Sequence, residues 1–327
     1  MGETSAMRAV IAGTGGYLPE RVLSNDQLAA EKGLDTSDAW IVERTGIRQR
    51  HFAAPGETAS SMGMAACRAA LAQAGAEPDE VDAIIVATAT PDSAFPSTAA
   101  RIQGGLGVTR GLAFDVAAAC AGFIYALGIA DALVRTGQAR GVLVVGTEVY
   151  SRILDWTDRG TCVLFGDGAG AVFLRAGTPA HGDGLLSTHM HADGRYGDIL
   201  NVDGGAGSTG GTGVVRMAGR EVFKHAVTKL ASAVDEALAA NGLSHADVAW
   251  LVPHQANVRI IEAMGRKLGL GLDRVVVTVD RHANTSAASI PLALAEAVRD
   301  GRIKKGDLVL MEAIGGGLTW GAALARF

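Results

Sequence analysis

An internal repeat is the sequence feature that most constrains how this chain folds. Residues 70–86 and residues 237–252 share an Ala-Leu pair, a following glycine and an apolar stretch, at a constant offset of 167. Further along, Arg135 and Arg299 match at an offset of 164. Each copy predicts a helix that ends at a glycine, followed by a buried strand. The chain is therefore expected to contain two copies of one βα unit, facing each other across a pseudo-twofold axis.

Two strongly apolar segments occupy matching places in the copies. Residues 116–130 follow an expected strand at 112–116, and a helix at 287–298 follows an expected strand at 275–279. A helix that is apolar all round must be covered on every side, so we expect an α/β fold with both helices between two sheets. With 327 residues, 48% of them hydrophobic, the chain can bury such a core. An amphipathic outer helix is expected at 221–240, with Phe223 among the residues of its apolar face. A mobile loop is expected at 204–213, and further strands at 9–12, 141–145, 250–252 and 308–312.

Charge and cysteine content narrow the possible functions. The net charge of −5 argues against a nucleic-acid binder, which needs a basic face for the phosphates. The longest apolar run, 116–130, is shorter than the roughly 20 residues that span a bilayer, and the first residues lack a leader pattern, so neither membrane insertion nor export is expected. Cys67, Cys120 and Cys162 form no CxxC pair. We therefore expect no disulfide framework, no metal site and a cytoplasmic location.

Two glycine clusters invite a nucleotide-binding interpretation. Residues 13–16 follow an expected strand but lack the third glycine of a dinucleotide loop, which favours an ordinary turn. Residues 166–170 lack the lysine of a phosphate-binding loop, which favours a tight hairpin.

Three polar residues follow strands in the matched units. Cys120 lies where a strand passes into a helix, and the positive end of the helix favours its thiolate. His254 follows the strand at 250–252, and the offset of 164 places Asn284 opposite Cys120. Taken singly, these residues could be a small buried hydrophobe, a structural histidine and a turn or cap residue. Together they lie at the strand ends where α/β sheets build their sites.

The surrounding motifs closely resemble one enzyme family, β-ketoacyl-acyl-carrier-protein synthase III. The resemblance covers essentially the whole chain and rests on Cys120 in DVAAACAGF, His254 in PHQAN, Asn284 in RHANTSAAS and the C-terminal GGGLTWG. It implies the thiolase fold, a duplicated five-layer αβαβα sandwich with two buried central helices. Residues 1–176 would then form the half carrying the nucleophile, and residues 177–327 the half carrying His254 and Asn284.

The resemblance implies a decarboxylative Claisen condensation that initiates fatty-acid synthesis. A short acyl-coenzyme A, with acetyl-coenzyme A as the expected primer, acylates Cys120, and the carbanion from malonyl-acyl carrier protein attacks the thioester. His254 and Asn284 would donate hydrogen bonds to the enolate, and the amides of Cys120 and Gly316 would form the other oxyanion hole. Coenzyme A enters as a thioester substrate, and no permanently bound cofactor is expected.

The same resemblance assigns binding residues. Trp40, Arg44, Arg159 and Asn257 would hold coenzyme A; Lys224, Arg259, Arg266 and Lys267 would meet the acidic carrier protein; Phe95 and Ile314 would shape the acyl pocket. Phe95 would cross the interface of a homodimer to reach the partner's pocket. The alternatives are a core role for Trp40, a helix cap for Asn257, a solvated charged face for the cations, and a local core aromatic for Phe95.

Other functions share parts of this pattern. A papain-like cysteine hydrolase has the order Cys, His, Asn, but its sequence signature is missing. Thiolases generally require a later catalytic cysteine, and none follows Cys162. Elongating synthases generally use two histidines, where this chain has His254 and Asn284. A condensing enzyme of secondary metabolism with another primer or acceptor stays open, as does an acyl-binding homologue without catalysis.

Overall fold

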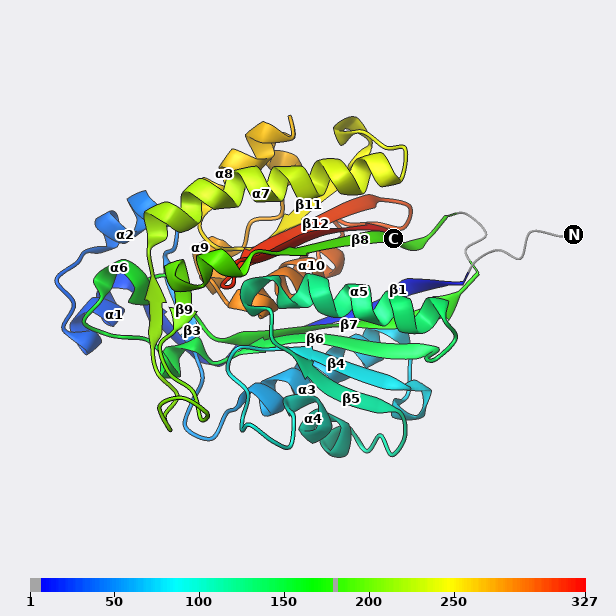
Figure 1. Cartoon of the computed structure of the whole chain (residues 1–327), viewed down its shortest axis with the longest axis horizontal. Helices are drawn as coiled ribbons and strands as arrows, with labels where there is room; N and C mark the ends of the chain where they lie inside the picture. The colour runs from blue at the N-terminus through cyan, green and yellow to red at the C-terminus, as the bar shows by residue number, and fades with distance from the viewer. Residues whose placement is uncertain (1–6, 179–181) are drawn as a thin grey trace, which may run out of the picture.

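The computed structural model describes residues 7–178 and 182–327 and places their main elements in five layers (Figure 1). The first sheet has the strand order β1-β7-β6-β4-β5. The β4 strand is parallel to β6 and β5, while β7 is antiparallel to β6 and β1. Its strands are β1 (Arg8–Tyr17), β4 (Ala83–Ala87), β5 (Leu112–Val116), β6 (Gly141–Glu148) and β7 (Gly168–Gly177).

The second sheet repeats this topology. Its order is β8-β13-β12-β11, with β11 parallel to β12 and the other pairs antiparallel. A single parallel bridge from Leu251 to Val275 stands where β5 stands in the first sheet. The strands are β8 (Gly184–Ala192), β11 (Trp250–Pro253), β12 (Leu308–Gly315) and β13 (Thr319–Arg326). The duplicated order confirms the predicted repeat, while the division of the chain at residue 176 stays a prediction.

Helices fill the layer between the sheets and cover their outer faces (Figure 1). The central layer holds α5 (Gly122–Arg135) and α10 (Ser289–Arg299), which are mostly buried because sheets lie on both sides. Pro291 is the third residue of α10, where its missing N–H costs no helical hydrogen bond. The outer helices are α3 (Ala59–Ala74) and α4 (Thr98–Leu106) on the first sheet, and α7 (Gly219–Ala240) and α8 (Val258–Lys267) on the second. The five-layer order with two central helices confirms the expected architecture.

The expected strand at 275–279 is wrong. Only Val275 pairs, and the chain turns into the short helix α9 (Val279–His282). The buried side chain of Gln255 takes over the hydrogen bonds that a neighbouring strand would make. Its amide nitrogen donates to the Val276 carbonyl at 3.0 Å, and its oxygen accepts from the amides of Thr278 at 2.8 Å and Val279 at 3.1 Å.

Both glycine clusters lie in strands, so the predicted turn and hairpin are wrong. Residues 13–16 belong to β1, and residues 168–170 begin β7. A Cβ atom on Gly15 would lie 2.2 Å from the Ala66 carbonyl oxygen of α3. A Cβ atom on Gly170 would lie 2.6 Å from the amide of Leu292 in α10. The glycines therefore allow central and outer helices to pack directly on the sheet backbone.

Short elements gather at one end of the sheets (Figure 1). They are α1 (Asn25–Lys32), α2 (Asp38–Thr45), α6 (Arg159–Cys162), β2 (Arg21–Ser24), β3 (Gln49–Phe52), β9 (Leu200–Val202) and β10 (Val215–Met217). The loop expected at 204–213 connects β9 to β10, and its mobility stays a prediction. Within the described ranges, no helix is both long and apolar enough to cross a membrane.

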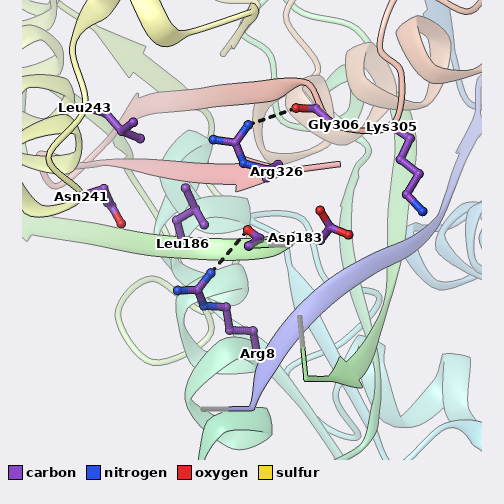
Figure 2. A pocket seen from close by; sticks show the side chains of 9 residues that line it. Arg8, Asp183, Leu186, Asn241, Leu243, Lys305, Gly306 and Arg326 are labelled. Carbon is purple, nitrogen blue, oxygen red and sulfur yellow. Dashed lines mark hydrogen bonds between the residues drawn. The ribbon is translucent and has the colours of Figure 1, made fainter. Parts of the chain in front are cut away.

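The other end of the sheets carries an open cavity of about 590 Å³ (Figure 2). Arg8, Lys305 and Arg326 line it together with Asp183. These residues stand at the start of β1, before β12 and at the end of β13, so this cavity is remote from the strand ends that carry the predicted site.

Candidate active site

Cys120 lies in a 3₁₀ turn, Ala119–Ala121, between the end of β5 and the start of α5. Ala119 has a φ of 45°, a conformation that a residue with a Cβ atom rarely adopts. The second sheet packs closely against this turn. A Cβ atom on Gly315 would lie 2.5 Å from the Cys120 amide, and the Thr319 hydroxyl donates to the Ala118 carbonyl at 2.8 Å. The turn is thereby fixed between the central helix and the second sheet.

Burial controls the protonation of Cys120. The residue is 5% exposed, and desolvation raises the pKa of its thiol to about 12, although the Ser286 hydroxyl acts to lower it. Burial therefore opposes ionisation of the Cys120 thiol, whereas the helix terminus favours the thiolate, and the thiolate expected from the sequence stays a prediction. Burial raises the pKa of Cys67 as well, and that of Cys162 to about 11.

His254 follows β11 and is held at two points. Its amide donates to the Glu312 carbonyl at 2.8 Å, and Nδ1 lies 2.6 Å from the Ser289 hydroxyl at the start of α10. Burial lowers the pKa of His254 to about 4, so the imidazole is neutral at pH 7. With the Ser289 hydroxyl donating a hydrogen bond to Nδ1, Nε2 carries the ring proton and becomes a donor.

Asn284 is oriented by the backbone around it. Its backbone N–H donates to the Leu164 carbonyl at 2.9 Å, and its side-chain Oδ1 accepts from the backbone N–H of Ser286 at 2.8 Å. Because the Ser286 N–H can pair only with the amide oxygen, Nδ2 is the atom available to donate. Asn284 and His254 therefore both offer neutral N–H donors.

The structure brings the three predicted residues together. Cys120, His254 and Asn284 line one cavity of about 690 Å³, with Ile314 also in its wall. A smaller, mainly apolar chamber of about 270 Å³ also reaches Cys120. It is lined by Gly316, the predicted partner of the Cys120 amide, and by Tyr150 and Phe165, whose rings stack at 4.7 Å. Ile314 lies in the wall of the larger cavity.

The predicted coenzyme A residues lie at the mouth of the larger cavity. Trp40 of α2 is half-buried, and the guanidinium groups of Arg44 and Arg159 lie 4.5 Å and 5.2 Å from its ring centre. Arg159 also bonds to Asp35, and its neighbour Gly160 lines the cavity. A flat aromatic surface beside two cations suits an adenine ring and its phosphates.

Asn257 and the expected carrier-protein residues lie on α7 and α8. Asn257 accepts from the Ile260 amide at 3.1 Å as the N-cap of α8, and it also lines the cavity. The structure is therefore compatible with a helix cap and with a coenzyme A contact at Asn257. Arg259 reaches the Glu43 carbonyl at 3.1 Å. Lys224, Arg266 and Lys267 are exposed, with Lys224 3.9 Å from Glu221 and Arg266 3.7 Å from Glu262.

Two aromatic side chains, Phe95 and Phe223, are exposed and not part of the buried core. Phe95 is 85% exposed, so its interpretation as a local core aromatic is wrong. Phe223, expected on the buried face of its helix, is 41% exposed and lines the cavity mouth with Arg220. Helical periodicity predicted the face of α7 on which Phe223 lies. It did not predict that the first turn of α7 extends beyond the sheet, which leaves Phe223 exposed.

Comparison with known proteins agrees with this geometry. The family models for 3-oxoacyl-[acyl-carrier-protein] synthase III match residues 114–194, and those for its C-terminal part match residues 238–327. The β-ketoacyl-[acyl-carrier-protein] synthase III of Acidiphilium cryptum is 67% identical over 98% of this chain and 99% of its own length. The chain belongs to the β-ketoacyl-acyl-carrier-protein synthase III family. It is thus an acyltransferase of the condensing type that acts in fatty-acid synthesis, and the cysteine hydrolase alternative is wrong.

Solved synthase III structures share the whole fold. The enzyme from Aquifex aeolicus is 48% identical, covers 98% of this chain and 100% of its own, and superposes with a TM-score of 0.92. That from Pseudomonas aeruginosa is 45% identical over 98% of both chains, with a TM-score of 0.91. The priming β-ketosynthase of the R1128 polyketide pathway is 36% identical over 100% of this chain and 98% of its own, with a TM-score of 0.92. The thiolase-like fold expected from the motifs is confirmed.

Proposed function

We propose that Cys120 is the nucleophile of this synthase and that its primer is a short acyl-coenzyme A, with acetyl-coenzyme A the first candidate. The convergence of Cys120, His254 and Asn284 in one cavity carries this proposal. The chamber of about 270 Å³ beyond the thiol supports a short primer, because it has room for a small acyl group and is mainly apolar.

The chemistry divides between two oxyanion sites. Attack by the Cys120 sulfur on the primer thioester develops negative charge on a carbonyl oxygen, which the amides of Cys120 and Gly316 would stabilise. Loss of CO₂ from malonyl-acyl carrier protein develops charge on the enolate oxygen. The neutral N–H groups of His254 and Asn284 stabilise that charge without protonating the carbanion, because burial keeps His254 neutral and the N–H of a neutral imidazole is a far weaker acid than an imidazolium ion.

Substrate delivery uses the mouth of the cavity. Trp40, Arg44, Arg159 and Asn257 hold the coenzyme A portion, and the exposed cations Lys224, Arg259, Arg266 and Lys267 attract the acidic carrier protein. The charges on α7 and α8 lie on helices that line the same mouth, which supports delivery of both substrates by one route.

The functional unit we propose is a homodimer. Strand β5 is an edge strand of the first sheet, and its first residue, Leu112, is 43% exposed. Phe95 is exposed in the loop that precedes α4. An unpaired edge beside exposed apolar side chains is a natural surface for a second copy, whose acyl chamber Phe95 would then close. The cytoplasmic location stays a prediction.

A primer panel tests the proposal. Intact-mass spectrometry after incubation with acetyl-, butyryl-, isobutyryl- and octanoyl-coenzyme A should show one added acyl group, with acetyl transferred fastest. Added malonyl-acyl carrier protein should then remove the group and release CO₂. Preference for a long or branched primer would favour the secondary-metabolism alternative, and absence of acylation with every primer would contradict the proposal.

A further inference from the structure

The two proposed enolate donors, His254 and Asn284, come from separate segments of the second half of the chain. His254 follows β11, whereas Asn284 comes after the short helix α9. Two N–H donors stabilise one enolate oxygen only when both point at the position of that oxygen, and a displacement of about 1 Å can cost about 10²-fold in rate. The fold must therefore hold the two segments at a fixed spacing.

Backbone pairing joins these two segments at their beginning. Val275 forms a parallel bridge with Leu251 of β11, and the Val276 N–H donates to the Leu251 carbonyl at 2.9 Å. The chain then turns into α9, which begins at Val279. Because the first N–H groups of a helix have no partner inside it, those of α9 need an acceptor from another part of the chain.

Gln255, which directly follows the histidine, supplies that acceptor from a fully buried side chain. Its Oε1 accepts from the backbone N–H groups of Thr278 at 2.8 Å and Val279 at 3.1 Å. Its Nε2 donates to the carbonyls of Pro253 at 2.8 Å and Val276 at 3.0 Å. A carboxamide has two N–H donors and an oxygen with two lone pairs, so this side chain uses its whole hydrogen-bonding capacity to join the two segments.

One set of these contacts reaches His254. Pro253, whose carbonyl accepts from the Gln255 side chain, is the residue before the histidine. The backbone N–H of Gln255 donates to the Ser289 hydroxyl oxygen at 3.3 Å, and that hydroxyl holds Nδ1 of His254 at 2.6 Å. Gln255 thereby fixes the backbone before His254 and contacts the group that orients its ring.

The other set of contacts reaches Asn284 through α9. Val279 binds Gln255 with its N–H, and its carbonyl accepts from the Ala283 N–H at 3.1 Å. Ala283 has a left-handed φ of 58° and directly precedes Asn284. The position of Gln255 is therefore transmitted, through one turn of helix, to the strained residue from which Asn284 follows.

We propose that Gln255 fixes the spacing between His254 and Asn284 and is thereby a positioning residue for the decarboxylation of malonyl-acyl carrier protein. This inference rests on the proposed role of both side chains as enolate donors. The four hydrogen bonds of the Gln255 side chain all go to backbone groups, so it acts through the two donors. Acylation of Cys120 uses the other oxyanion site and does not depend on this spacing.

Substitution of Gln255 should separate the two half-reactions. Gln255→Met has a side chain of similar length without the four hydrogen bonds, so the maximal rate of CO₂ release from malonyl-acyl carrier protein should fall roughly 10–10²-fold, with KM for the carrier protein unchanged. Single-turnover acylation by acetyl-coenzyme A, followed by intact mass, should keep the rate of the unaltered enzyme, which also shows that the variant is folded. Gln255→Asn retains the amide on a side chain one methylene shorter and should lose less CO₂ release than Gln255→Met.

A double variant distinguishes positioning from a general loosening of the fold. Once Asn284→Ala has removed one donor, the spacing between the donors no longer matters, so adding Gln255→Met should reduce CO₂ release little further. Thr147→Val is the control, because it removes a buried hydroxyl that donates to the Ala59 carbonyl at 2.8 Å, between β6 and α3. It should change neither half-reaction.

Three results would contradict the positioning role while leaving the proposed function intact: normal CO₂ release in Gln255→Met, equal loss of acylation and CO₂ release in that variant, or a full additional loss in the double variant. Absence of acylation in the unaltered enzyme would overturn the proposed function, and this inference with it.

Discussion

Ala119 and Ala283, 164 residues apart in matched halves, both have left-handed backbone angles, with φ of 45° and 58°. Each is followed directly by a proposed site residue, Cys120 or Asn284. A non-glycine residue adopts such an angle only where its surroundings impose it, and such positions concentrate at functional sites. The duplication has therefore preserved one strained backbone turn and given its two copies different chemistry.

Asn284→Ala should separate the half-reactions. The variant keeps Cys120 and the Ser286 hydroxyl but removes one donor to the enolate, so acyl-enzyme should accumulate and CO₂ release should fall about 10²–10³-fold. Single-turnover acylation by mass, alongside CO₂ release from malonyl-acyl carrier protein, measures both steps. Slow acylation with normal CO₂ release would show that Asn284 serves the nucleophile instead.

Arg266→Glu with Lys267→Glu should weaken recognition of the carrier protein alone. Reversing two exposed charges should raise KM for malonyl-acyl carrier protein roughly tenfold at low salt, and less at high salt, because exposed charges act through a screened attraction. Self-acylation from acetyl-coenzyme A should be unchanged. The control is Lys304→Glu with Lys305→Glu, the same change of charge at two exposed lysines of the remote end, where Figure 2 shows Lys305. An equal rise in KM for both pairs would argue against a localised docking face.

Gly15→Ala should destabilise the fold by about 1–3 kcal/mol of unfolding free energy, because the new Cβ atom would lie 2.2 Å from a carbonyl oxygen of α3. Gly104→Ala is a matched control: it lies in α4 with nothing within 4 Å of the new Cβ atom, so it should stabilise the protein by up to about 1 kcal/mol. Denaturant unfolding monitored by circular dichroism measures both. If Gly15→Ala were neutral, close packing of α3 on β1 would not be the reason for glycine there.

Phe95→Ser should weaken the proposed dimer. Burial of each Phe95 side chain in a partner is worth about 1.5–3 kcal/mol, so the dimer dissociation constant should rise at least tenfold. Sedimentation velocity across a dilution series measures this. Leu272→Ser, at another exposed apolar residue (53% exposed), should leave the constant unchanged. A monomeric unaltered enzyme would contradict the dimer outright.

The sequence predicted the parts of the site that local pattern determines. Cys120 and His254 each follow a strand in a repeated unit, and the offset of 164 places Asn284 opposite Cys120 although the short helix α9, not a strand, precedes it. Ser289, which holds His254, has no such signal, because it is one small residue among several in an alanine-rich helix start.

Errors in the predicted fold have the same origin. A strand pattern at 275–279 could not reveal that the Gln255 side chain would satisfy that backbone. The glycines at 13–16 have the composition of a turn, and only the approach of α3 explains why they stand inside a strand. In both places a contact between distant segments overrides the local preference.

Acyl transfer to Cys120 is the central claim, and intact-mass spectrometry of three cysteine variants with acetyl-coenzyme A tests it most directly. Cys67→Ser and Cys162→Ser should each gain one acetyl group at the rate of the unaltered enzyme, because Cys67 is enclosed in the core and Cys162 lies outside the two cavities that meet at Cys120. Cys120→Ser should gain none. An acetyl group retained by Cys120→Ser, or lost with either of the other two substitutions, would contradict the account.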